Sequence, residues 1–121
     1  MRLLLLSMFL IFYQVSFGQQ KKVCFTFDDL PVVNYGITDS VYQKALFNKI
    51  VFSLKTNNVP AIGFVNGRKL YDNKNEIQYQ VGLLENWVSS GLELGNHTFS
   101  HPDYNKVSFS NYTDDLIKEN P

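Results

Sequence analysis

Short apolar segments that favour strands alternate with amphipathic segments along most of this chain, and this alternation constrains the fold more than any other feature. Residues 23–27 and 61–65 are typical of strands buried in a parallel sheet, and residues 92–96 form a weaker third segment. Pro31 cannot continue a central strand, so residues 30–36 are expected to form a loop. Strands separated by helices pair in parallel through right-handed crossovers, and the pattern therefore predicts an α/β fold.

Three helices are expected between and after these strands. The first begins at Ser40, because Ser40 and Gln43 have the spacing of a capping box and apolar residues then recur at helical intervals. The second follows the polar residues 72–75 and is ended by Gly91. Its expected apolar stripe consists of Ile77, Val81, Leu84 and Val88. The third is a marginal helix over residues 108–120.

Residues 1–18 have the organisation of a signal peptide. Arg2 supplies the positive charge, the following run is overwhelmingly apolar, and small residues precede an expected cleavage between Gly18 and Gln19. A membrane-spanning helix needs roughly 20 apolar residues, so an uncleaved anchor is the second interpretation. We expect export to the cell envelope, the periplasm or the medium, with no stable membrane span after cleavage.

The remaining length and composition suit one globular domain, over residues 22–121. The chain has 121 residues, of which 45% are hydrophobic, and 11 basic side chains balance 11 acidic ones. Because no basic stripe interrupts this balance, nucleic acid is not expected as a partner. The oligomeric state is left open. Cys24 is the only cysteine, so no disulfide can form within the chain, and its apolar surroundings predict a buried, inert thiol.

Reactive side chains follow two of the predicted strands. Asp28 and Asp29 come after the first strand, and His97 and His101, the only histidines, come after the third. Each group has a structural explanation on its own, because Asp often caps a turn and two His can share an exposed turn. In parallel α/β folds, however, the carboxyl ends of strands meet at one edge of the sheet. Two imidazoles and one carboxylate there would suit Zn²⁺, leaving the other carboxylate as a base.

Both segments resemble sequence motifs of one family. Residues 25–29 resemble the first motif, and residues 96–102 the second, of the polysaccharide deacetylase family, also called NodB-homology or carbohydrate esterase family 4. The resemblance covers the chain from Val23 onward. It implies the N-terminal part of a deformed (β/α) barrel with parallel strands, in a hydrolase that removes N- or O-linked acetyl groups from a polysaccharide or cell-wall glycan.

The same resemblance assigns roles to four residues. It implies that Asp28 is the general base that activates a metal-bound water, and that Asp29, His97 and His101 bind Zn²⁺ or another divalent transition metal. It implies that Thr98 supports the histidine loop. The implied partner is an acetylated glycan.

This sequence departs from the family pattern at two places. Leu30 stands where most members have Gly, and we expect it to alter the entrance to the substrate groove. The later motifs of the family, which supply an orienting Arg, an Asp-rich segment and an acidic His, are absent, because no His follows His101 and no Arg follows Arg68. The chain is therefore expected to be a truncated portion of the domain. Two alternatives stay open: a non-sugar amide hydrolase with the same site, and an inactive, glycan-binding relic.

Overall fold

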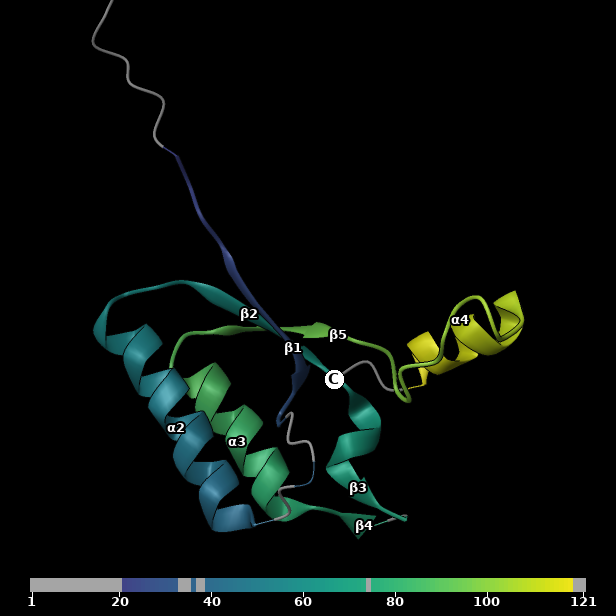
Figure 1. Ribbon diagram of the computed structural model, residues 1–121, viewed down its shortest axis with the longest axis horizontal. Coiled ribbons are helices and arrows are strands. Elements are labelled where there is room, and N and C mark those ends of the chain that lie inside the picture. Colours follow the sequence, from purple (N-terminus) through teal and green to yellow (C-terminus); the bar gives the residue numbers. More distant parts are fainter. Residues whose placement is uncertain (1–20, 33–35, 37–38, 74, 119–121) are drawn as a thin grey trace, which may run out of the picture.

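Three parallel strands and two long helices form the main body of the protein. The computed structural model describes residues 21–32, 36, 39–73 and 75–118 (Figure 1). The strands of the sheet lie in the order β1–β2–β5, and both pairings are parallel, as the sequence predicts. Their bounds are β1 Phe25–Leu30, β2 Ala61–Val65 and β5 Glu93–Asn96.

Helices connect the strands on one side of the sheet. Helix α2 (Ser40–Thr56) joins β1 to β2, and α3 (Gln78–Ser89) precedes β5. The two helices lie side by side against the same face (Figure 1). Because helices on one face leave the other to line an interior, this arrangement suits a segment of barrel wall.

The core lies between the sheet and these two helices. Trp87 of α3 is its centre, with 1% of its surface exposed. Its ring makes an edge-to-face contact with Phe27, at 5.5 Å between ring centroids, and its Nε1 donates a hydrogen bond of 2.8 Å to the Glu93 carbonyl. The buried hydrophobic residues are Leu30, Phe47, Val51, Leu54, Ala61, Val65, Leu83, Leu84, Trp87 and Leu92. Val88, predicted to face the core, is instead 53% exposed.

Strand β1 extends beyond its predicted end. Its pairing with β2 is regular up to Phe27, shifts over the two aspartates, and resumes where Leu30 pairs with Val65. Such an irregularity bends a strand and redirects side chains without ending the pairing. The predicted loop therefore does not include Leu30, and Pro31 ends the strand.

Leu30 is a core residue, and its side chain also lines the cavity beside Asp28. It is 7% exposed, and its side chain occupies the space where a Cβ on Gly63 would lie. The absence of a side chain at Gly63 on β2 thus makes room for a large one on β1.

Two local expectations are also corrected. Asp39, not Ser40, caps α2, because its Oδ1 accepts hydrogen bonds from the backbone N–H groups of Val41 (2.8 Å) and Tyr42 (3.4 Å). Cys24 is exposed rather than buried, since it lies before β1 begins and outside the helix-covered part of the sheet.

Three short elements and one terminal helix complete the described chain. The sequence did not predict the 3₁₀ helix η1 (Gly67–Leu70) or the two-residue strands β3 (Tyr71–Asp72) and β4 (Asn75–Glu76), which pair antiparallel. Helix α4 (Phe109–Ile117) lies within its predicted range. None of the helices in the described part of the chain is long and apolar enough to cross a membrane. The predicted signal peptide lies outside the described residues.

Candidate metal centre

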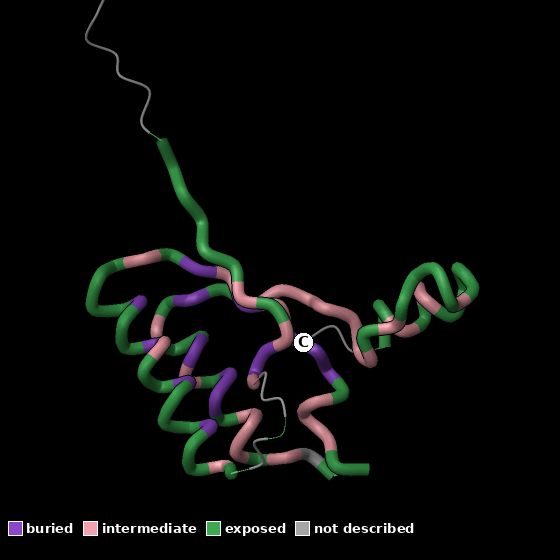
Figure 2. Tube along the Cα trace, in the orientation of Figure 1, coloured by how far each residue is buried: buried purple, intermediate pink, exposed green. Residues whose placement is uncertain are grey.

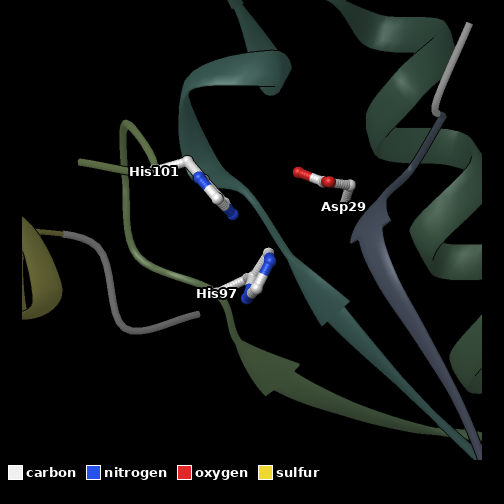
Figure 3. Close-up of side chains that lie close together, drawn as sticks. All are labelled: Asp29, His97 and His101. Atoms are coloured by element: carbon white, nitrogen blue, oxygen red, sulfur yellow. The ribbon is translucent and has the colours of Figure 1, made fainter. Parts of the chain in front are cut away.

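The carboxyl ends of β1 and β5 bring three potential metal ligands together. Asp29 lies in the irregular end of β1, His97 follows β5 directly, and His101 lies four residues further on (Figure 3). One ligand atom from each of the three residues lies within 4.8 Å of the others. The sequence prediction that these residues share one edge of the sheet is therefore correct.

The geometry and chemistry of this group suit a divalent transition metal. The two imidazole rings lie 4.7 Å apart between centroids at an interplanar angle of 70°. Asp29 and His97 are half-buried, whereas His101 is exposed, which leaves one side open. Zinc bonds of about 2.0–2.1 Å in a tetrahedral site place ligand atoms roughly 3.4 Å apart.

Asp28 does not belong to the three-residue group. It is exposed, and it lines a mainly apolar cavity of about 150 Å³ on the helix side of β1. Phe27, Leu30, Pro31, Val32, Leu46, Phe47, Ile50 and Trp87 form the rest of that lining. The structure thus separates the adjacent aspartates into one that joins the histidines and one that does not.

Three residues of the site have a left-handed backbone. The φ angles are 65° at Asp29, 64° at Thr98 and 56° at His101. A non-glycine residue in this region costs roughly 1–2 kcal/mol, so neighbouring contacts must hold each one in place. Such strained backbone is common at binding and catalytic sites.

Lys69 of η1 holds Asp29. Its Nζ donates a 2.7 Å hydrogen bond to the Asp29 carbonyl and lies 3.2 Å from the carboxylate Oδ1. No sequence motif singled out Lys69, because the contact depends on the path of η1 beside the end of β1.

The loop that carries the histidines is held from within and from η1. Asn96 Oδ1 accepts a hydrogen bond from the Thr98 N–H (2.6 Å), and Thr98 Oγ1 accepts one from the His101 N–H (3.1 Å). The N–H groups of Gly67 and Arg68 donate to the carbonyls of Thr98 and Phe99 at 3.3 and 2.7 Å. Thr98 therefore makes the kind of supporting contact that the family resemblance implied.

Asp115 of α4 is a second residue that sequence reasoning missed. Its carboxylate accepts hydrogen bonds from the Ser100 N–H (2.9 Å) and the Ser100 Oγ (2.6 Å). Burial raises the pKa of Asp115, but hydrogen bonds outweigh this effect and leave the pKa below its ordinary value, with the largest contribution from Ser100 and smaller ones from Phe99 and Thr98.

Asp103 and Tyr104, which lie near His101 in the sequence, do not join the group. Asp103 pairs with Lys106 at 3.0 Å, and the Lys106 ammonium and the Asn105 N–H lower the pKa of the Asp103 carboxyl. Tyr104 makes an edge-to-face contact with Tyr112 at 5.0 Å.

The protein is thus an α/β protein with a candidate metal centre. The centre consists of one carboxylate and two imidazoles at the carboxyl edge of a parallel sheet. Comparison with protein families then identifies the family. The polysaccharide deacetylase family model matches residues 17–120, and the chain belongs to this family. Among curated proteins, none matches the chain closely enough to count as a relative.

Solved structures of deacetylases have the same fold. The peptidoglycan deacetylase PdaC from Bacillus subtilis is 29% identical, with a TM-score of 0.59 over 82% of this chain and 40% of its own. A family 4 carbohydrate esterase from Bacillus anthracis is 30% identical, with a TM-score of 0.55 over 78% of this chain and 38% of its own. The chitin deacetylase from the fungus Colletotrichum lindemuthianum is 25% identical, with a TM-score of 0.56 over 78% and 36%. The chain thus spans about two fifths of these proteins' length.

Proposed function

We propose that this protein is a metal-dependent hydrolase that removes acetyl groups from a polysaccharide or cell-wall glycan. The observation that carries the proposal is the convergence of Asp29, His97 and His101 from two distant segments of the chain. Membership of the polysaccharide deacetylase family supports the same activity.

In this proposal Asp29, His97 and His101 hold Zn²⁺ or another divalent transition metal. A bound ion of this kind supplies a Lewis acid that polarises an acyl carbonyl and lowers the pKa of water. Asp28 acts as the general base and accepts a proton from the attacking water. Its place outside the ligand group supports this role, because a carboxylate not bound to the metal keeps an oxygen free for the proton.

The structural relatives support an acetylated glycan as the substrate class. One structure similar to this chain is described as a peptidoglycan N-acetylglucosamine deacetylase, at 29% identity, and another as a chitin deacetylase. We infer that this protein acts on an acetylated glycan, with N-acetyl groups as the first to test. Acetate release would be compared between peptidoglycan and chitin oligosaccharides, which carry N-acetyl groups, and acetylated xylan, which carries O-acetyl groups. The comparison shows which type of acetyl group the protein removes.

Thermal unfolding with and without Zn²⁺ tests the metal centre directly. Zinc at about 100 times its Kd would stabilise the folded protein by about 2.7 kcal/mol, because only the folded state brings the ligands together. The protein, expressed from its complete reading frame, should therefore show a higher Tm with Zn²⁺. His97→Ala should abolish that increase.

Asp103→Asn provides a matched control for this experiment. Asp103 lies in the same loop region but outside the ligand group, so its variant should keep the zinc-dependent increase in Tm. An unchanged Tm of the parent protein with Zn²⁺, Mn²⁺ and Co²⁺ would contradict the metal centre and favour an inactive relic.

Export remains part of the proposal. We propose that residues 1–18 are a signal peptide, that residues 22–121 belong to the deacetylase domain, and that the mature protein acts outside the cytoplasm. Intact mass of the protein recovered from its source should correspond to a chain that begins at Gln19. A mass that retains residues 1–18 would favour the uncleaved anchor.

A further inference from the structure

Helix α4 is attached to the protein without a hydrophobic core of its own. None of its residues is buried, and Phe109 and Ile117 are each 72% exposed. In Figures 1 and 2 the helix stands apart from the sheet and from α2 and α3, and only the segment after β5 leads to it. Its position must therefore depend on other contacts.

Those contacts are mainly polar, and apart from the ring contact of Tyr112 with Tyr104 they reach the segment that carries the histidines. The Asn96 side chain donates to the Leu116 carbonyl (2.9 Å), and the Phe99 N–H donates to the Asp115 carbonyl (3.2 Å). Lys118 Nζ lies 4.0 Å from the centroid of the Phe99 ring. Ser100 adds two hydrogen bonds to the Asp115 carboxylate. Helix α4 is therefore held to residues 96–100 by contacts near both ends of that segment.

Ser100 is the residue of this segment at which a hydrogen bond best restrains the backbone that carries the histidines. It lies between Thr98 and His101, both of which have a left-handed backbone. A single carboxylate that accepts from both the N–H and the hydroxyl of Ser100 fixes its position and its orientation. Hydrogen bonds to an ionised acceptor are roughly twice as strong as those between neutral groups.

We propose that Asp115 is a positioning residue that holds the His97–His101 loop in its ligand-presenting form before any ion binds. The inference rests on the proposed function, because that function makes His97 and His101 metal ligands. Asp115 is not itself in the ligand group and acts through Ser100. Residues that orient metal ligands in this way typically change metal affinity by about tenfold to hundredfold when removed.

The zinc Kd of three variants tests this proposal, measured by competition with a chelator on protein expressed from its complete reading frame. Asp115→Ala removes both carboxylate hydrogen bonds and should weaken zinc binding by about tenfold or more. Asp115→Asn should recover part of the affinity lost in Asp115→Ala, because its oxygen accepts from the Ser100 N–H and its amide donates to the Ser100 hydroxyl, but without the negative charge that strengthens both bonds. Asp114→Ala, at an exposed neighbouring position of α4, is the matched control and should leave the Kd unchanged.

Amide hydrogen exchange of the metal-free protein provides a readout that does not depend on zinc. The Ser100 N–H donates to the Asp115 carboxylate, so it should exchange faster in Asp115→Ala and at the parent rate in Asp114→Ala. Should Asp115→Ala fail to fold, Ser100→Ala removes only the hydroxyl contact. That variant should weaken zinc binding in the same direction by a smaller factor.

The outcomes separate this inference from the proposed function. A parent protein that binds zinc, with an Asp115→Ala variant of equal Kd and equal amide exchange, would overturn the positioning role and leave the function intact. Equal losses in Asp115→Ala and Asp114→Ala would also overturn it, because the effect would then belong to α4 in general. A parent that binds no divalent metal would instead overturn the proposed function.

Discussion

Asp28 and Asp29 are neighbours in the sequence, yet the fold gives them different surroundings. The left-handed backbone at Asp29 turns its carboxylate toward the histidines and Lys69. Asp28 stays exposed beside a mainly apolar cavity. Asp tolerates a left-handed backbone better than most residues, because its short polar side chain can bond locally. The choice of aspartate at position 29 therefore suits the backbone as well as the chemistry.

Replacing Asp28 by Asn should distinguish the role of general base from the role of metal ligand. We expect deacetylation to slow by about 10²- to 10⁴-fold, because a positioned general base typically contributes that much. The zinc-dependent increase in Tm should remain, since Asp28 is outside the ligand group. Acetate release and thermal unfolding measure the two effects on the same sample. Loss of the zinc response in this variant would show that Asp28 is a ligand instead.

At the scale of elements, β1 and β2 pack closely because a large residue on β1 lies against a glycine on β2. Leu30 is buried, and Gly63 leaves the space that Leu30 occupies. Leu30 lies next to Asp29, so this packing also anchors the irregular end of β1 that carries the candidate ligand. The departure from the family pattern at Leu30 is thus explained by packing.

A double-mutant cycle tests this packing. Gly63→Ala should destabilise the protein by about 1–3 kcal/mol, because the added methyl overlaps Leu30 and crowds Trp87. In a Leu30→Ala background the same change should cost less by roughly 1 kcal/mol or more, since the space is then free. Urea unfolding measures each free energy. Gly82→Ala, on α3 with open space around it, is the control and should stabilise the helix by about 0.5–1 kcal/mol.

The contact between helix α4 and the histidine loop should weaken in acid. The folded pKa of Asp115 is below its ordinary value of 3.8, so its carboxylate stabilises the docked helix fully above that value. This contribution is lost as the pH falls below 3.8, through the lower folded pKa. The amide signal of Ser100 in an NMR titration of the metal-free protein should report the loss. A midpoint at or above the ordinary Asp value would contradict the hydrogen bonds that we describe.

At the scale of the whole molecule, one tryptophan joins the sheet to both helices. Trp87 contacts Phe27 of β1 and Phe47 of α2, and its Nε1 bonds the backbone of β5. Because β1 and β5 also carry the candidate ligands, the same core that stabilises the fold sets the spacing of the site.

Truncating this residue should therefore unfold much of the protein. We expect Trp87→Ala to cost about 3–5 kcal/mol, a large part of the stability of an ordinary domain. Val88→Ala, at the adjacent but 53% exposed position, should change stability by less than about 0.5 kcal/mol. Denaturant unfolding of both variants, followed by circular dichroism, gives the comparison. Equal losses at the two positions would contradict the assignment of Trp87 to the core.

Much of the fold was predictable because its signals are local. The strands at residues 61–65 and 92–96, the helices and the parallel order follow from hydrophobic period and turn residues. The errors arose where a tertiary contact decided the outcome. Cys24 has an apolar neighbourhood in the sequence but nothing to cover it, and Val88 fits the helical period but faces outward.

The sequence by itself determined the α/β class, the family and the aspartate pair and two histidines from which a metal centre could form, because residue types and their spacing carry that information. Only the tertiary structure showed that Asp29 joins the histidines while Asp28 does not, since the irregular pairing of β1 depends on β2. Only the tertiary structure brought Lys69 to Asp29 and Asp115 to Ser100. These contacts join residues that lie far apart in the sequence, and no local pattern predicts them. They form only when the whole chain packs.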